Sequence, residues 1–222
     1  MRLVNVIKNP VGRKLFMALT GLAMAAFLVV HLLGNTTLFA GSDALNTYAA
    51  TLHRLGPLVW VARLGLAALL AAHVGFGVWL TLENRRARPE KYAVRNRRAA
   101  TFASQTMIWS GLVLLAFIVL HLAHFTLRLL WPEASHALDG AGRPDVFLMV
   151  TENFRHPLRA LVYVGAMAAL FCHLAHGLQS LCQTFGLNND RTLPVIARLG
   201  LFAALALAAG IAFIPLWALG GF

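Results

Sequence analysis

The sequence predicts an all-α integral membrane protein with five transmembrane helices. Of its 222 residues, 59% are hydrophobic and only 12% are charged, whereas a water-soluble domain carries about 25% charge. The apolar residues fall into five runs, each near the roughly 20 residues that a helix needs to cross the hydrocarbon core. Five spans and their loops use the whole chain, so we expect a single transmembrane domain over residues 1–222 and no separate soluble catalytic domain.

Proline marks several helix edges, because it lacks an amide proton and favours helix ends. These edges are at Pro57, Pro132, Pro157 and Pro194. We predict helices over residues 14–39, 58–82, 102–130, 157–182 and 194–218. The basic N-terminal stretch leads into an apolar run that is too long for the core of a signal peptide, so we interpret that run as a retained first helix. We expect no internal repeat.

The basic residues predict the orientation in the membrane. The chain carries 19 Lys and Arg against 8 Asp and Glu, and many of the basic residues lie in the N-terminal tail and in the loop 85–98. Because such residues stay on the cytoplasmic side, we expect a multi-pass protein of the inner (cytoplasmic) membrane with its N-terminus inside and its C-terminus outside. No basic stretch is interleaved with stacking aromatic residues in a soluble module, so we expect no nucleic-acid partner.

Histidines are the unusual polar residues of the predicted spans. Six of the nine histidines lie within them: His31, His73, His121, His124, His173 and His176. A polar side chain in hydrocarbon is costly and by default marks function. A lone histidine is readily satisfied by a carbonyl of a neighbouring helix, but here four helices each supply at least one.

The depth of these histidines suggests two pairs. At 1.5 Å per residue, His31 and His121 lie about 25 Å from the cytoplasmic ends of their helices, and His73 and His173 about 15 Å. Two pairs at two levels are typical of two haems, each bound by two histidines and stacked across the bilayer. Proton relays and zinc sites normally recruit carboxylates or thiolates, and the interiors of the first four predicted helices contain no acid.

Two further histidines are alternative ligands. His124 and His176 lie three residues after His121 and His173 and face roughly the same way. The depth favours His121 over His124, because His124 would lie about 4–5 Å higher than His31. On the fourth helix the depth does not decide between His173 and His176.

Short motifs in a fixed order resemble a known family. FLVVHLLGN, ALNTYAA, HVGFGVW, IVLHLAHF, HLAHGLQS and QTFG are similar to segments of the dihaem cytochrome b subunit that anchors succinate dehydrogenase and fumarate reductase. The resemblance covers essentially the whole chain and implies five helices, the first four of which form a haem-binding bundle. It implies two b haems, the inner one bound by His73 and His173 and the outer one by His31 and His121.

The resemblance also implies partners. A flavoprotein subunit and an iron–sulfur subunit would dock on the cytoplasmic face. We expect the basic loop 85–98 to contribute to docking the iron–sulfur subunit, because it is the largest cluster of like charge on that face. This chain would then be the non-catalytic electron-transfer subunit of a succinate:quinone oxidoreductase, with menaquinone or another quinone as the membrane substrate. A haem near the outer face is useful mainly if the quinone lies there too, and that level offers polar side chains as hydrogen-bond donors. The candidates are Asn35, Asn46, Tyr48 and His53.

Two other hypotheses remain at this point. The chain could be the cytochrome b subunit of a membrane formate dehydrogenase or hydrogenase, which would also be dihaem and would differ in its catalytic partners. It is also compatible with a haem-free membrane anchor or transporter whose histidines are satisfied by other helices. For the quinone candidates, the alternative is local capping or anchoring at the membrane interface.

Overall fold

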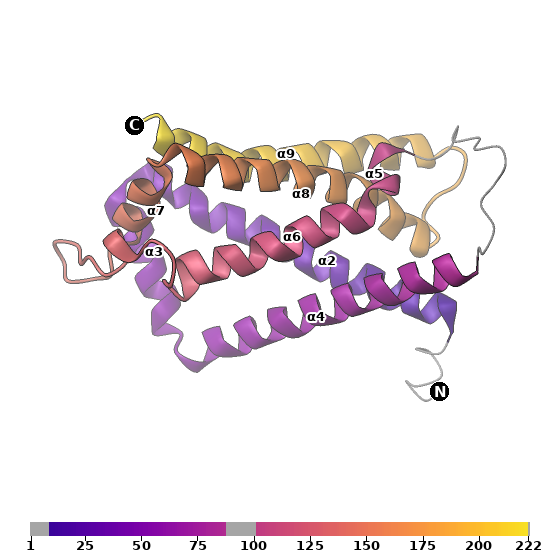
Figure 1. Ribbon diagram of the computed structural model, residues 1–222, viewed down its shortest axis with the longest axis horizontal. Helices are drawn as coiled ribbons and strands as arrows, with labels where there is room; N and C mark the ends of the chain where they lie inside the picture. Colours follow the sequence, from indigo (N-terminus) through magenta and orange to yellow (C-terminus); the bar gives the residue numbers. More distant parts are fainter. Residues whose placement is uncertain (1–8, 88–100, 222) are drawn as a thin grey trace.

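The computed structural model describes residues 9–87 and 101–221. Over these residues the protein is helical and has no β-sheet, and five helices are long and apolar enough to cross a membrane. Figure 1 shows them running side by side along the long axis of the molecule. The predicted fold class, an all-α protein with five potential transmembrane helices, is therefore confirmed.

The spanning segments lie close to the predicted ranges. The first comprises α2 (Pro10–Asn35) and a 3₁₀ extension, η1 (Thr36–Ala40). The others are α4 (Pro57–Arg86), α6 (Met107–His121) with a π-helical turn, η2 (Leu122–Thr126), α8 (Pro157–Thr184) and α9 (Leu193–Leu219). Pro10, Pro57 and Pro157 each occupy the first helical position, where the missing amide proton costs no hydrogen bond.

The predicted boundaries of the second and third spans are wrong. The third span is not one helix over 102–130: a short helix, α5 (Phe102–Gln105), is separated from α6 at Thr106, and the helical segment ends at Thr126. The chain turns soon afterwards, where Arg128 and Trp131 adopt positive φ angles. The second span continues past 82 to Arg86, and this extension places Glu83 inside α4.

The two ends of the bundle differ. The basic end is where α2, α6 and α9 begin and where α4 and α8 end. The capped end carries two helices that the sequence reasoning left as loops, α3 (Ser42–Arg54) and α7 (Val146–Phe154). Figure 1 shows α3 and α7 together at this end, with a long loop containing a short 3₁₀ turn, η3 (Pro132–Ala134), beside them.

The helices pack unequally. The α8–α9 contact is the most extensive, with small residues such as Ala166, Ala204 and Ala208 buried in it, as is usual where membrane helices approach closely. By contrast, α4 packs mainly on α2, touches α6 only lightly and buries none of its residues. The surface of α4 that does not face α2 is thus free to contact lipid or other non-protein groups.

The chain contains an internal repeat, contrary to expectation. Residues 17–32 (MALTGLAMAAFLVVHL) align without a gap with residues 107–122 (MIWSGLVLLAFIVLHL), and residues 65–77 (GLAALLAAHVGFG) align with residues 165–177 (GAMAALFCHLAHG). The structure places the repeated positions in equivalent contacts, because the methyl group of Met17 lies beside Gly77 and that of Met107 lies beside Gly177. The pair α2–α4 is therefore repeated as α6–α8.

Candidate functional site

Two histidines face each other between α4 and α8. The ring centroids of His73 and His173 lie 6.2 Å apart, with the ring planes inclined at 64°. His73 is on α4 and His173 is at the equivalent position of α8, so each half of the repeat contributes one ring. Both rings are partly buried.

Each ring of this pair is hydrogen-bonded to a hydroxyl group. The hydroxyl comes from the other helix of the same half of the repeat, α2 for His73 and α6 for His173. Nδ1 of His73 lies 3.2 Å from Oγ1 of Thr20 on α2, and Nδ1 of His173 lies 3.2 Å from Oγ of Ser110 on α6. The next residue in each helix is a glycine, and its missing side chain leaves room for the ring. A Cβ atom at Gly21 would lie 3.1 Å from Cε1 of His73.

A second pair lies between α2 and α6, nearer the capped end. The ring centroids of His31 and His121 are 5.9 Å apart, with nearly perpendicular planes. Aromatic rings surround this pair: Phe27 stacks on His31 at 5.4 Å, and Phe117 and Phe125 lie within 6 Å of His121. Nδ1 of His121 is buried and has no hydrogen-bond partner among residues 9–87 and 101–221.

The repeat fixes the separation of the two pairs. Thr20 contacts one pair and His31 belongs to the other, and eleven residues of α2 separate them. At 1.5 Å per residue the two levels differ by roughly 16 Å along the helix. This separation is larger than the roughly 10 Å predicted from the sequence.

The two alternative histidines lie in other surroundings. His124 is fully buried, and its Nδ1 lies 2.8 Å from the hydroxyl of Tyr163. Its ring stacks on Phe125 at 3.9 Å and meets Trp131 edge-on at 4.8 Å. The π-helical turn Leu122–Thr126 adds one residue to this part of the helix, which accompanies the different setting of His124. His176 lies half-buried on α8, where the repeat has Phe76 in the other half.

The residues present suit a cofactor that needs two protein ligands. No three His, Cys, Asp or Glu side chains come together as a metal site in the described parts of the chain, so a protein-only zinc centre has no support there. A haem iron takes only axial ligands from the protein. Two opposed imidazoles set in apolar and aromatic surroundings fit that requirement.

The quinone candidates lie at the capped end. The amide of Asn46 is fully used within the protein: its nitrogen donates to Asp139 and Asp145, and its oxygen accepts from the backbone of Phe147. The side chain of Asn35 donates to the carbonyl of His31 at 2.7 Å. The hydroxyl of Tyr48 lies directly over Gly34, where any side chain would collide with it.

His53 is the candidate that lines a pocket. With Trp60 and Arg63 it borders an open pocket of about 450 Å³ at the capped end of α4. The guanidinium of Arg63 lies 5.1 Å over the ring of Trp60. The sequence reasoning did not single out Arg63, although a cation inside a predicted span was a visible signal.

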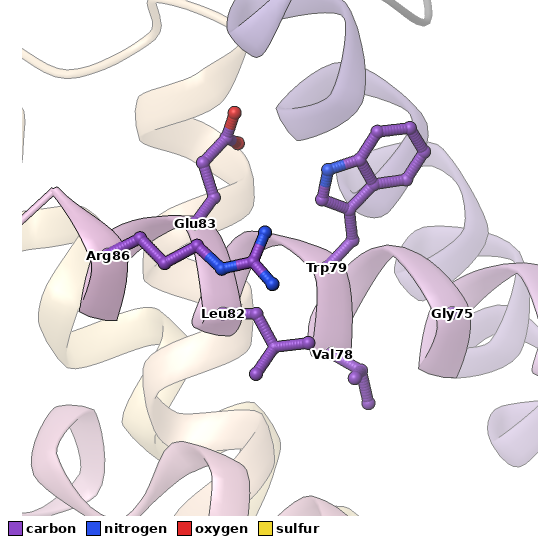
Figure 2. A pocket seen from close by; sticks show the side chains of 6 residues that line it. All are labelled: Gly75, Val78, Trp79, Leu82, Glu83 and Arg86. Carbon is purple, nitrogen blue, oxygen red and sulfur yellow. The ribbon is translucent and has the colours of Figure 1, made fainter.

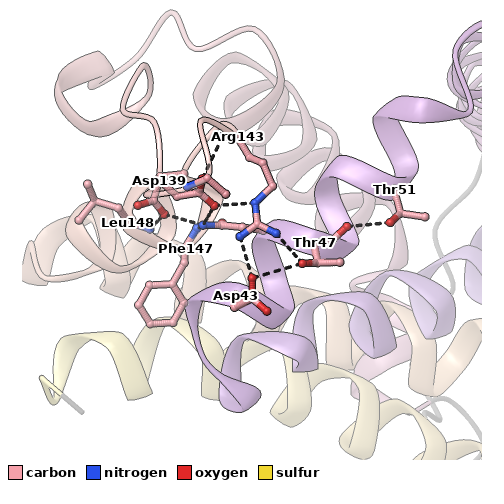
Figure 3. Close-up of polar contacts among 10 residues, drawn as sticks. Asp43, Thr47, Thr51, Asp139, Arg143, Phe147 and Leu148 are labelled. Carbon is pink, nitrogen blue, oxygen red and sulfur yellow. Dashed lines mark hydrogen bonds and ion pairs between the residues drawn. The ribbon is translucent and has the colours of Figure 1, made fainter.

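An ionic network holds the cap together. Arg143 pairs with Asp139 at 2.7 Å and with Asp43 of α3 at 2.8 Å, and it donates to Thr47 (Figure 3). Desolvation acts to raise the pKa of Asp139, but hydrogen bonds from Arg143 and Ala141 outweigh it and hold that pKa below its usual value. The network ties the loop before α7 to α3.

The basic end carries a further ion pair that the sequence reasoning missed. The buried Arg13 donates to both oxygens of Glu83 at 2.6 and 2.7 Å and lies 5.0 Å over the ring of Trp79. Trp79, Glu83 and Arg86 also line an open pocket of about 510 Å³ along α4 (Figure 2). The expected end of the second helix at residue 82 hid this contact.

Comparison with known proteins assigns the family. The family model of the succinate dehydrogenase/fumarate reductase transmembrane subunit matches residues 81–214, more than half of the chain. The chain belongs to this family. No curated protein and no solved structure matched it. The match includes His121 and His173, whereas His31 and His73 lie before it.

Family membership makes this chain a membrane subunit of a succinate dehydrogenase/fumarate reductase complex, with other subunits as its partners. The anchor hypothesis drawn from the sequence motifs is thereby confirmed at the level of the family. The alternative of a formate dehydrogenase or hydrogenase subunit is not supported.

Proposed function

We propose that this subunit carries electrons between the iron–sulfur subunit of its complex and a membrane quinone, through two b haems. His73 and His173 would hold the haem near the basic end, and His31 and His121 the haem near the capped end. The observation that carries the proposal is the pairing of four histidines from four different helices into two opposed pairs.

The spacing of the rings supports a metal-containing group held between the two histidines of each pair. A metal–imidazole bond is about 2 Å long, so two imidazoles that bind one metal from opposite sides have ring centroids roughly 6 Å apart. The two pairs have centroid distances of 6.2 and 5.9 Å. By contrast, His124 uses its Nδ1 to contact Tyr163 and packs within a cluster of aromatic rings.

The protein would bind, orient and insulate these groups. Bound b haems would supply reversible one-electron chemistry. The protein would set the reduction potential of each haem through its ligands, hydrogen bonds and burial. Apolar residues around the pairs exclude water, and Phe27, Phe117 and Phe125 do so at the capped end. The light contact between α4 and α6 is compatible with a bound group between these helices.

The basic end is the proposed docking side for the soluble subunits. Under the positive-inside rule this end faces the cytoplasm, and the flavoprotein and the iron–sulfur subunit would lie against it. Of the basic loop 85–98, Arg85 and Arg86 close α4. The loop's remaining basic residues, Arg88, Lys91, Arg95, Arg97 and Arg98, lie outside the described residues. A single exposed pair contributes only about 0–1 kcal/mol, so docking would rest on several charges together.

The quinone, menaquinone or another, would bind near the capped end. His53 supports this placement because it lines a pocket with Trp60 and Arg63. Tyr48 and Asn35 lie on the same side of the bundle. Asn46 contributes to the fold of the cap, since its amide is already fully hydrogen-bonded.

A difference spectrum tests the proposal. We expect the purified complex to show b-type absorption on reduction and to contain two haems for each copy of this chain. A complex that contains this subunit, with no b-type absorption, would instead make the chain a haem-free anchor and reject the proposal.

A further inference from the structure

The internal repeat extends beyond the histidines to the groups that contact them. In α2 and α6 the same four features recur at the same spacing: a methionine, a hydroxyl residue, a glycine and, eleven residues after the hydroxyl, a histidine. These are Met17, Thr20, Gly21 and His31 in α2, and Met107, Ser110, Gly111 and His121 in α6. In each half the hydroxyl contacts the histidine of the partner helix, His73 or His173, at 3.2 Å.

The hydroxyl groups determine which nitrogen of each ring carries the proton. A hydroxyl has one proton to donate. Oγ1 of Thr20 lies 2.8 Å from the carbonyl oxygen of Phe16 and donates to its own helix. The contact with His73 must then have the imidazole Nδ1–H as its donor, which leaves the lone pair of Nε2 free.

Ser110 makes the equivalent contacts in the second half of the repeat. Oγ of Ser110 lies 3.1 Å from the carbonyl oxygen of Met107, so its proton is used in its own helix as well. Nδ1–H of His173 is therefore the donor to Ser110. A Cβ atom at Gly111 would lie 3.3 Å from Cε1 of His173, and the absence of a side chain there lets the ring approach the hydroxyl.

The other pair lacks this arrangement. Nδ1 of His121 is buried and makes no hydrogen bond within the part of the chain that the structure describes. The repeated hydroxyls thus serve one level of the bundle, that of His73 and His173. A metal-binding histidine commonly donates its second N–H to an acceptor, which fixes the ring and strengthens the ligand.

We propose that Thr20 and Ser110 are positioning residues that fix the tautomer and orientation of His73 and His173, so that Nε2 of each ring points to a haem iron. This inference rests on the proposed function. The two residues act through the histidines and touch no iron themselves. The two hydroxyl groups also make each imidazole a stronger electron-pair donor to the iron. A stronger ligand favours the oxidised iron, so the reduction potential of that haem is lowered.

The test compares Thr20→Val and Ser110→Ala with a matched control. Thr81→Val is the control, because Thr81 also lies in a spanning helix and donates to its own backbone at Gly77 (2.7 Å). Potentiometric titration and low-temperature electron paramagnetic resonance would follow each haem separately. Haem content and thermal stability in detergent would report on folding.

We expect Thr20→Val and Ser110→Ala to raise the midpoint potential of the His73/His173 haem and to weaken its retention by about 10–100-fold. The other haem, the thermal stability and the Thr81→Val variant should remain unchanged. Since the repeat uses Thr in one half and Ser in the other, Thr20→Ser and Ser110→Thr should both retain the original potential.

Three outcomes would overturn the inference: an unchanged His73/His173 haem in both hydroxyl deletions, equal shifts of both haems, or the same shift in Thr81→Val. A wild-type complex without b haem would reject the proposed function itself, and the wild-type spectrum is recorded before any variant. The two failures are therefore distinguishable.

Discussion

The two ends of the bundle hold similar histidine pairs in different surroundings. At the basic end, His73 and His173 are hydrogen-bonded through Thr20 and Ser110, and an ion pair between Arg13 and Glu83 lies on the same side. At the capped end the pair is packed among aromatic rings, and the network of Arg143 ties the cap together.

This difference shows how one repeated unit acquires two environments. Each half contributes one histidine to each pair, so the ligands are equivalent by sequence. The hydroxyl residue and the glycine after it occur once in each half, as Thr20–Gly21 and Ser110–Gly111. In both halves they lie at the level of the His73/His173 pair. Hydrogen bonding and burial are the means by which a protein tunes a bound haem, so we expect the two sites to differ in their properties.

The strongest test removes one pair at a time. Replacing His73 or His173 with alanine should lower the haem content by about half and leave the capped-end haem recognisable in the spectrum, while replacing His31 or His121 should do the reverse. The loss follows because each haem would be held by the two histidines of one pair. His176→Ala and His124→Ala are the matched controls and should retain both haems.

The assignment on α8 would be wrong if His173→Ala kept both haems and His176→Ala lost one. If His124→Ala lost the haem that His121→Ala should lose, the assignment on the third span would be wrong as well. Haem content by pyridine haemochrome and visible spectra of the purified complexes decide both points.

A glycine substitution should distinguish the two levels. Gly111→Val introduces a side chain where a Cβ atom alone would lie 3.3 Å from the His173 ring, and the valine methyl groups should displace that ring from Ser110. We expect loss of the basic-end haem with retention of the other, measured by spectroscopy. Gly75→Val is the control, because no atom lies within 4 Å of a Cβ there. Loss of the capped-end haem in Gly111→Val would contradict the assignment.

The cap should lose stability in acid. The pKa of Asp139 is lowered in the folded protein, so its contribution is present above the unfolded pKa of about 3.9 and is lost as the pH falls through the lower folded value. Limited proteolysis of the loop 136–146 should accelerate in that acidic range. Arg143→Gln should already accelerate it at neutral pH and flatten the pH dependence, and an unaltered cleavage rate in this variant would count against the network.

The smallest expected effect concerns the quinone. His53→Ala or Tyr48→Phe should slow quinone turnover roughly fivefold, the effect of one hydrogen bond worth about 1 kcal/mol, with both haems retained. A quinol-analogue inhibitor should perturb the capped-end haem more than the other. An inhibitor that shifted only the His73/His173 haem would move the site to the basic end.

The sequence alone determined the number of spans and the histidines to examine. Runs of apolar residues have the length of the membrane core, and polar residues within them stand out because hydrocarbon offers them no partner. Proline favours helix starts, and those at Pro57 and Pro157 were predicted to within a residue. Neither signal depends on how the helices pack.

Tertiary structure alone decided which groups meet. The hydroxyls of Thr20 and Ser110 look like ordinary polar residues of a membrane helix, and only the packing of α2 on α4 and of α6 on α8 brings them to the histidines. The same holds for α3, whose buried Asn46 is held by contacts with Asp139, Asp145 and Phe147, far along the chain. A contact between distant segments depends on helix rotation and crossing, which the periodicity of a single segment does not specify.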